Sequence, residues 1–285
     1  MKYGHRDDIV QLTPLWKGDR FEDGRPRVPD EILKRVEQVK TEEAWGVLRR
    51  AGYEFQFEGD WHTIHPDQTL VGRAVTGVFV PRRPDMHDSL MEYGHDQEKR
   101  IGEMNAWVIQ SLVKDDVMVI DLFGKVVEGT MVGGNLSTAV ATRTGRGQVI
   151  YGGIRDAQQI RGIANLNTFC KGVDPSAIKN VTLVGLNSPC RIGRATCLPG
   201  DVVLGTYTGV VFIPPHLAED VCVHAELTRL REIFGFQRLR EGIYSASQMD
   251  TKWTPEIEAD FDEWRKTNTP PEFEHLNFQL RPDNT

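Results

Sequence analysis

The sequence lacks the features that mark membrane, exported and nucleic-acid-binding proteins. No run approaches the roughly 18 apolar residues that cross a bilayer, and residues 1–12 are charged and have no apolar core of the signal-peptide kind. The formal net charge is −7 at pH 7 without a long block of lysine and arginine, whereas nucleic-acid binders normally carry a basic stripe. We therefore predict a cytoplasmic protein with neither a membrane nor a nucleic acid as partner.

Cysteine is scarce and scattered. The four cysteines are Cys170, Cys190, Cys197 and Cys222. None belongs to a CxxC pair, and a structural zinc site normally uses such closely spaced pairs. We therefore predict buried, reduced thiols.

The chain has 285 residues, of which 39% are hydrophobic and 26% charged, enough for one large globular domain or two small ones. Its patterns predict helices from Asp30, over 41–50, over 84–113 with a break near Gly94, and over 136–144, and strands over 70–80, 117–122 and 148–151. Residues 167–214 indicate mostly strands, and an apolar stripe from Val223 to Phe234 predicts a long helix. Residues 243–285 indicate either an extension wrapped on the body or a neighbouring subunit, or a loosely ordered tail.

Chemistry concentrates in residues 133–156. Gly133, Gly134 and Asn135 directly precede a predicted helix. Glycines let the backbone turn sharply, and the free N–H groups of a helix start bind anions such as carboxylates. The sequence therefore predicts an anion site here.

A second glycine pair, Gly152-Gly153, follows a predicted strand and precedes Arg155 and Asp156. A tight turn there would project both side chains from the strand end, where α/β folds place their sites. Asp156 offers an oxygen ligand for Mg²⁺ or Mn²⁺, and Arg155 offers a planar cation for a carboxylate or an enolate. The alternative is an ordinary surface pair that caps the next short helix.

Taken in order, these motifs resemble the RraA-like family, which includes divalent-metal-dependent 4-hydroxy-4-methyl-2-oxoglutarate aldolases and an inhibitor of RNase E. The resemblance continues through Leu198-Pro199-Gly200-Asp201 and Thr208-Gly209-Val210-Val211-Phe212-Ile213-Pro214 and covers about residues 35–242. It implies a compact α/β sandwich of the swivelling-domain type, with an N-terminal arm over 1–34 and a C-terminal extension over 243–285. It also implies a homotrimer or hexamer with sites at subunit interfaces.

The resemblance assigns roles to particular residues. It implies that Asp156 is the metal ligand, with waters in most other positions, and that Arg155 holds a 2-oxo acid and stabilises its enolate. The backbone around Gly134, Asn135 and Leu136 would hold the substrate carboxylate. Glu232 would reach the metal-bound water of a neighbouring subunit, although the alternative is an ordinary solvated helix charge.

One departure from the family pattern bears on the reaction. Where the aldolases carry an acidic residue after the first glycine, this chain has Gly134, which puts proton transfer in question, but it keeps Asp156, which the inhibitor branch lacks. His87 or His95 could supply an acid or base, although a solvated helix is the preferred interpretation of that stretch. His62 and His65 could form a metal pair but are better explained as structural.

We therefore predict a metal-dependent lyase of aldolase, decarboxylase or dehydratase type, acting on a small 2-oxo or hydroxy acid through an enolate. The alternative is a non-catalytic regulatory or binding protein on the same fold. A dinucleotide enzyme is a distant third, since residues 145–150 (GRGQVI) do not match G-x-G-x-x-G.

Overall fold

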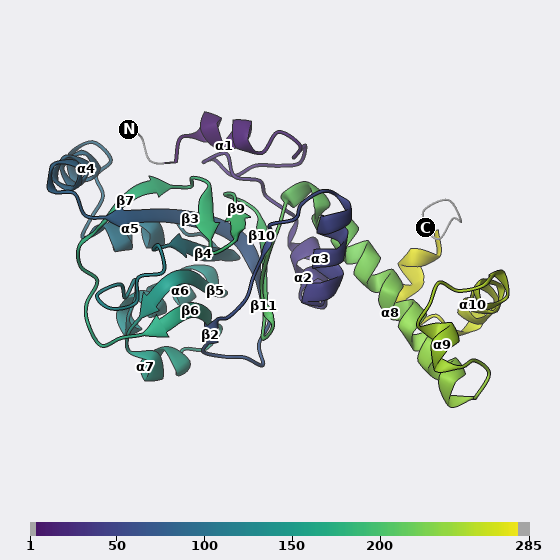
Figure 1. Cartoon of the computed structure of the whole chain (residues 1–285). Helices are drawn as coiled ribbons and strands as arrows, with labels where there is room; N and C mark the ends of the chain where they lie inside the picture. The colour runs from purple at the N-terminus through teal and green to yellow at the C-terminus, as the bar shows by residue number, and fades with distance from the viewer. Residues whose placement is uncertain (1–3, 279–285) are drawn as a thin grey trace. The chain divides into compact units, whose positions relative to one another are not determined.

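The computed structural model describes residues 4–278, and the chain divides into two compact units, Met1–Glu219 and Asp220–Thr285 (Figure 1). Within residues 4–278, no helix has both the length and the apolar character that crossing a membrane requires.

The first unit is built on a nine-stranded sheet with the order β1-β11-β10-β3-β4-β5-β6-β2, in which β7 also pairs with β3. Strands β3, β4, β5 and β6 run parallel to one another, and the other pairings are antiparallel. The strands are β1 (Phe57–Glu58), β2 (His62–Thr63), β3 (Leu70–Pro81), β4 (Asp116–Asp121), β5 (Gly147–Ile154), β6 (Asn167–Val173), β7 (Val181–Leu186), β10 (Val202–Thr206) and β11 (Gly209–Ile213). A separate hairpin pairs β8 (Cys190–Ile192) with β9 (Ala195–Cys197).

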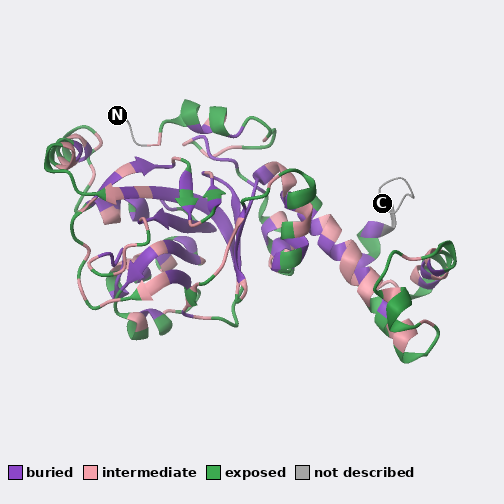
Figure 2. Cartoon of the chain, viewed as in Figure 1, coloured by how far each residue is buried: buried purple, intermediate pink, exposed green. Residues whose placement is uncertain are grey.

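Both faces of this sheet are covered, which gives the predicted layered α/β arrangement (Figure 2). The helices of the unit are α1 (Arg6–Leu12), α2 (Asp30–Val36), α3 (Thr41–Arg50), α4 (Pro84–Asp96), α5 (Met104–Gln110), α6 (Gly134–Thr144), α7 (Ala157–Arg161) and η1 (Pro215–Leu217). One core contains Trp107 of α5, Val140 of α6 and Ile160 of α7. The opposite core joins Phe169 and Phe212 to the β8–β9 hairpin. All four cysteines are free and buried, as predicted.

Strand β3 shows why the sequences of the central parallel strands are continuous apolar runs. Its first residues pair with β10 and its last with β7, while β4 lies along the other edge. Residues 70–77 are buried without interruption because both faces are covered. The predictions of this strand and of the helix over 41–50 are confirmed, and Gly52 has the left-handed φ of +85° that its position after a helix requires.

The helix break predicted near Gly94 is present, whereas the turn predicted at Gly152-Gly153 is wrong. Gly94 lies inside α4, and the break falls after Asp96; a Cβ at Gly94 would lie 2.3 Å from the Trp107 ring, so this glycine allows close packing. Gly152 and Gly153 form no turn, because β5 continues to Ile154 with an irregularity after Ile150. Their missing side chains leave room for residues 122–129, which cross directly over them.

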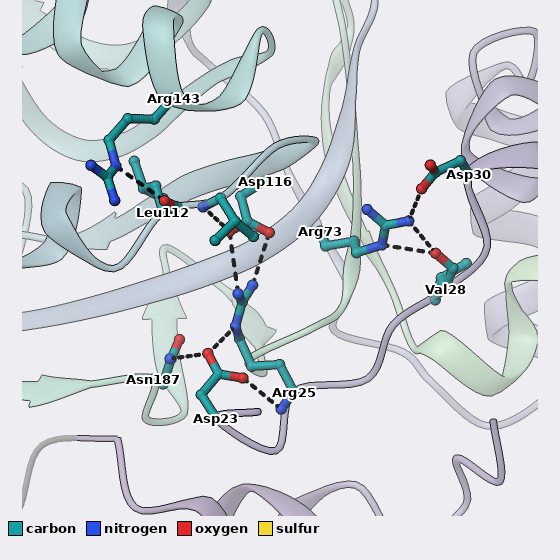
Figure 3. Close-up of polar contacts among 10 residues, drawn as sticks. Asp23, Arg25, Val28, Asp30, Arg73, Leu112, Asp116, Arg143 and Asn187 are labelled. Atoms are coloured by element: carbon teal, nitrogen blue, oxygen red, sulfur yellow. Dashed lines mark hydrogen bonds and ion pairs between the residues drawn. The ribbon is translucent and has the colours of Figure 1, made fainter. Parts of the chain in front are cut away.

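The N-terminal arm is fixed to the sheet by buried charges (Figure 3). The guanidinium of Arg25 donates to both carboxylate oxygens of Asp116, at 2.9 and 3.2 Å, and the two side chains are 1% and 0% exposed. Arg25 also donates to Asp23, which accepts a hydrogen bond from Asn187. Farther along, Arg73 of β3 donates to the carbonyl of residue 28 and to the carboxylate of residue 30. The arm is therefore part of the first unit.

The second unit consists of α8 (Ala218–Arg240), α9 (Ala246–Met249), α10 (Pro255–Asn268) and η2 (Pro271–Phe278). The predicted long helix is present, and its Leu230 and Phe234 pack against Phe261 and Trp264 of α10. The extension therefore forms a small core with α8. For this reason the chain divides at Glu219, whereas the sequence predicts a boundary at residue 242.

Candidate functional site

The loop before α6 and the end of β5 meet at a cavity of about 310 Å³. The residues that line it and bear on its chemistry are Asn105, Gly134, Asn135, Leu136, Arg155, Asp156, Gln159 and Ile178. Five of these were predicted from the sequence as site residues. Within the described part of the chain, Arg155 and Asp156 are the only charged residues of this lining.

The start of α6 faces this cavity. The first intrahelical hydrogen bond runs from Ser137 N–H to Gly133 O, so the N–H groups of the preceding residues are not used inside the helix. The N–H of Gly134 donates to Oδ2 of Asp156 at 3.2 Å. Those of Asn135 and Leu136 remain at the positive end of an eleven-residue helix, where an anion is favoured.

Asp156 has a left-handed backbone, with φ of 55°, directly after β5. Its backbone carbonyl accepts the first hydrogen bonds of α7, but its side chain makes no capping bond there and instead accepts from Gly134. Asp156 is therefore the N-cap residue of α7 by position, but its side chain does not cap this helix. Because asparagine and aspartate tolerate this conformation better than most other residues with a side chain, the strand end turns without a glycine.

Arg155 is held through its backbone, whose N–H donates to Val132 O at 3.0 Å. Its Nε lies 3.8 Å from Oδ2 of Asp156, and the two side chains are 45% and 40% exposed. An ion pair of this length in solvent contributes little to stability. The guanidinium fork is therefore available for a planar anion such as a carboxylate.

Other side chains approach Gly133 and Gly134 closely. A Cβ at Gly133 would lie 2.4 Å from Oδ2 of Asp156, and a Cβ at Gly134 would lie 2.1 Å from Oε1 of Gln159. Gln159 thus occupies the volume that a side chain at position 134 would need. No sequence pattern indicates Gln159 as a site residue, because only the one-turn helix α7 brings it back over the start of α6.

The described lining of this site offers one carboxylate, that of Asp156, to a divalent ion. Within residues 4–278, no group of three or more histidine, cysteine, aspartate or glutamate residues could hold a metal. A tetrahedral zinc site would need such a group. Mg²⁺ usually keeps several waters and binds through one or two carboxylates, and the half-exposed carboxylate of Asp156 can serve as one of them.

The histidines considered as acid or base lie elsewhere. His95 packs edge-on against Trp107, and its Nε2 lies 3.0 Å from Gly102 O. His87 borders a neighbouring cavity. His65 has its Nε2 3.0 Å from Arg161 O, and neither it nor His62 belongs to a metal cluster among the described residues.

Glu232 belongs to the second unit. It lies on α8 beside a cavity of about 870 Å³, whose lining includes Arg231 and Trp253. Its predicted role toward a neighbouring subunit stays a prediction.

The model of the RraA-like family, described as Aldolase/RraA, matches residues 37–212. The chain belongs to the RraA-like family. The matched range contains the whole cavity around Arg155 and Asp156. The family and the α/β fold that the sequence resemblance implied are thereby confirmed.

Among known relatives, Protein DlpA of Legionella pneumophila is 31% identical over 199 residues, which is 68% of this chain and 29% of DlpA. A Halalkalibacterium halodurans protein, provisionally named 4-hydroxy-4-methyl-2-oxoglutarate aldolase, is 31% identical over 112 residues, 39% of this chain and 52% of that protein. The matches therefore span about a third to a half of these relatives.

Among solved structures, Streptomyces coelicolor RraAS2, an unusual member of the RNase ES inhibitor RraA family, superposes with a TM-score of 0.62. It is 22% identical, and the match covers 77% of this chain and all of that one. This likeness supports the fold.

Proposed function

We propose that this protein is a divalent-metal-dependent lyase that acts on a small 2-oxo or hydroxy acid through an enolate. One observation carries the proposal: a single cavity is lined by the Asp156 carboxylate, the Arg155 guanidinium and the start of α6. These groups match the three requirements of enolate chemistry, namely an oxygen ligand for a metal, a cation for the developing oxyanion and donors for a carboxylate.

In this proposal, the free N–H groups of Asn135 and Leu136 bind the substrate carboxylate. Arg155 donates to the 2-oxo oxygen, where negative charge grows as the bond beyond C3 breaks and its electrons enter the enolate. Asp156 would hold Mg²⁺ or Mn²⁺, which when bound polarises the same carbonyl group.

Proton transfer needs a further group, because the described lining offers no third charged residue. A site completed by Glu232 of a neighbouring copy, in a trimer or hexamer, would provide one, as the family resemblance implies. Buried, free cysteines support a cytoplasmic location as part of the proposal. The same shortage of acid–base groups favours the second candidate, a regulatory protein that binds organic acids without converting them.

Calorimetric titration with Mn²⁺ and then with oxalate, which mimics an enolate, tests the proposal. We expect oxalate to bind only with metal present, and Asp156→Asn to lose metal affinity by tenfold or more. Asp67→Asn, which changes an exposed aspartate outside the cavity, serves as the matched control. Metal-independent oxalate binding, or unchanged metal affinity in Asp156→Asn, would refute the metal role.

A further inference from the structure

A second cavity, of about 360 Å³, adjoins the one around Arg155 and Asp156. Asn105 and Ile178 line both cavities. Asn105 is fixed at this junction because its side-chain amide donates to Met131 O at 3.1 Å. Asn105 and Ile178 therefore form the boundary that the two cavities share.

The second cavity is preformed by backbone hydrogen bonds between distant segments. Arg82 N–H donates to Asn180 O at 2.8 Å, which joins the end of β3 to the loop before β7. Lys179 N–H donates to Glu128 O at 2.9 Å, which joins that loop to the segment after β4. On α4, Nδ1 of His87 lies 3.0 Å from the Thr182 hydroxyl.

The lining contains both hydrogen-bond donors and acceptors. Arg82 and Lys179 can only donate, Glu103 can only accept, and the amide of Asn180 does both. The two cations also contact carboxylates outside the lining, at 3.2 Å to Asp88 and 3.6 Å to Glu128. Exposed pairs of this kind are weak, so both cations can turn to a ligand.

His87 adds a group that can donate and accept. Burial, followed by the positive charge of Arg82, lowers the pKa of its imidazole, although Asp88 and Glu103 oppose the shift. A neutral imidazole has one N–H and one bare nitrogen. Nδ1 of His87 contacts the Thr182 hydroxyl, and His87 lines the cavity.

Such a mixed lining distinguishes among the chains that a 2-oxo acid could carry. An alkyl chain would bury these polar groups without partners, which costs binding free energy. A second carboxylate could pair with Arg82 or Lys179 but would leave Glu103, which can only accept, without a donor from the ligand. Hydroxyl groups donate and accept at once, so a hydroxylated chain can satisfy both kinds of lining residue.

We propose that the substrate is a 2-oxo sugar acid, whose carboxyl end binds at Arg155 and whose hydroxylated chain extends past Asn105 and Ile178 into the cavity lined by Arg82, Glu103 and Lys179. This inference rests on the proposed function and narrows its substrate class. A substrate of this kind explains two features of the second cavity. It provides space that a three-carbon acid would not need, and it is lined by both positively and negatively charged groups.

The test compares the affinities of pyruvate and three six-carbon 2-oxo acids, measured by calorimetry with Mg²⁺ present. The three are 2-oxo-3-deoxygluconate, 2-oxohexanoate and 2-oxoadipate, which differ only in the part of the chain beyond C3. We expect 2-oxo-3-deoxygluconate to bind at least about tenfold more tightly than the other two. Equal affinities, or a preference for 2-oxoadipate, would overturn the assignment.

Substitutions in the lining of the second cavity test which residues cause the preference for 2-oxo-3-deoxygluconate. Arg82→Met and Glu103→Leu should each remove most of the preference for 2-oxo-3-deoxygluconate and leave the affinity for pyruvate unchanged. Arg83→Met is the matched control, because Arg83 is exposed and pairs with Asp85 outside the cavity. An unchanged preference in both lining variants would also overturn the assignment.

A spectroscopic measurement separates the two cavities. The imidazole resonance of His87, assigned with His87→Gln, should shift when 2-oxo-3-deoxygluconate is added and stay in place with pyruvate. If pyruvate and oxalate bind but hydroxyl groups bring no gain, the sugar-acid assignment fails and the proposed function stands. If none of these acids binds, both fail.

Discussion

Arg25–Asp116 and Arg155–Asp156 join the same two residue types, but they differ in length, burial and surroundings. The first pair has two hydrogen bonds and is almost completely buried, whereas the second is 3.8 Å long and nearly half exposed. Burial makes the first pair costly to break and useless for binding, since nothing can reach it. Exposure leaves the second with little effect on stability and with free donors and acceptors. An arginine beside an aspartate therefore does not make a binding site by itself. The exposure of the pair to solvent decides whether it can bind a ligand.

The largest effect on stability should come from breaking the buried pair. Arg25→Met leaves the Asp116 carboxylate buried without its cation, so we expect the free energy of unfolding to fall by about 3–5 kcal/mol. Urea denaturation measures this, with Arg6→Met as an exposed control. The double variant Arg25→Met/Asp116→Leu should recover part of the loss. A decrease below about 1 kcal/mol would contradict the role given to this pair.

Asp201 is a buried carboxyl group that, unlike Asp116, has no arginine partner among the described residues, so it shows what burial alone does to an aspartate. Burial raises the pKa of Asp201 to about 8 from its ordinary 3.8, opposed by the N–H of Leu198. Between these values the folded protein holds a proton that the unfolded chain has lost, so this stabilisation is complete below about pH 4 and is lost as pH rises through about 8.

Asp201→Asn removes this titration and keeps an oxygen that accepts from Leu198. We expect the fall in melting temperature between about pH 5 and pH 9 to be smaller in the variant than in the wild type. Parallel curves for the two proteins would show that Asp201 ionises normally.

A smaller effect is expected at Gly134. In Gly134→Ala the new methyl group displaces the flexible end of Gln159, while alanine gains helix propensity, so stability should change by less than about 1 kcal/mol. The displaced amide should weaken oxalate binding several-fold. Gly134→Ala/Gln159→Ala should restore it, and a double variant as weak as the single one would exclude Gln159 as the cause.

The sequence predicts the local elements and the cavity's main residues because these depend on short-range patterns. The helix over 41–50, the apolar run of β3 and the motif residues Arg155 and Asp156 are of this kind. Their gathering in one cavity is a consequence of the parallel sheet, in which the loops after β4 and β5 lie side by side.

The features that the sequence does not predict depend on contacts between residues that are distant along the chain. Arg25 and Asp116 are 91 positions apart, and no sequence pattern near either residue indicates that they pair. The role of Gly152 and Gly153 depends on the segment that crosses them. His87 comes to border a cavity next to Asn105 only through the packing of α4 and of the loop before β7.

Arg155→Lys tests the central claim most directly, because it should leave stability nearly unchanged while removing the planar fork that an enolate needs. The measurement is the exchange of the methyl protons of pyruvate for deuterium, monitored by NMR in D₂O with Mg²⁺. We predict that the wild-type protein accelerates this exchange and that Arg155→Lys, folded as stably, does so at least about tenfold more slowly. Exchange no faster than in buffer, or equally fast in the variant, would contradict the account.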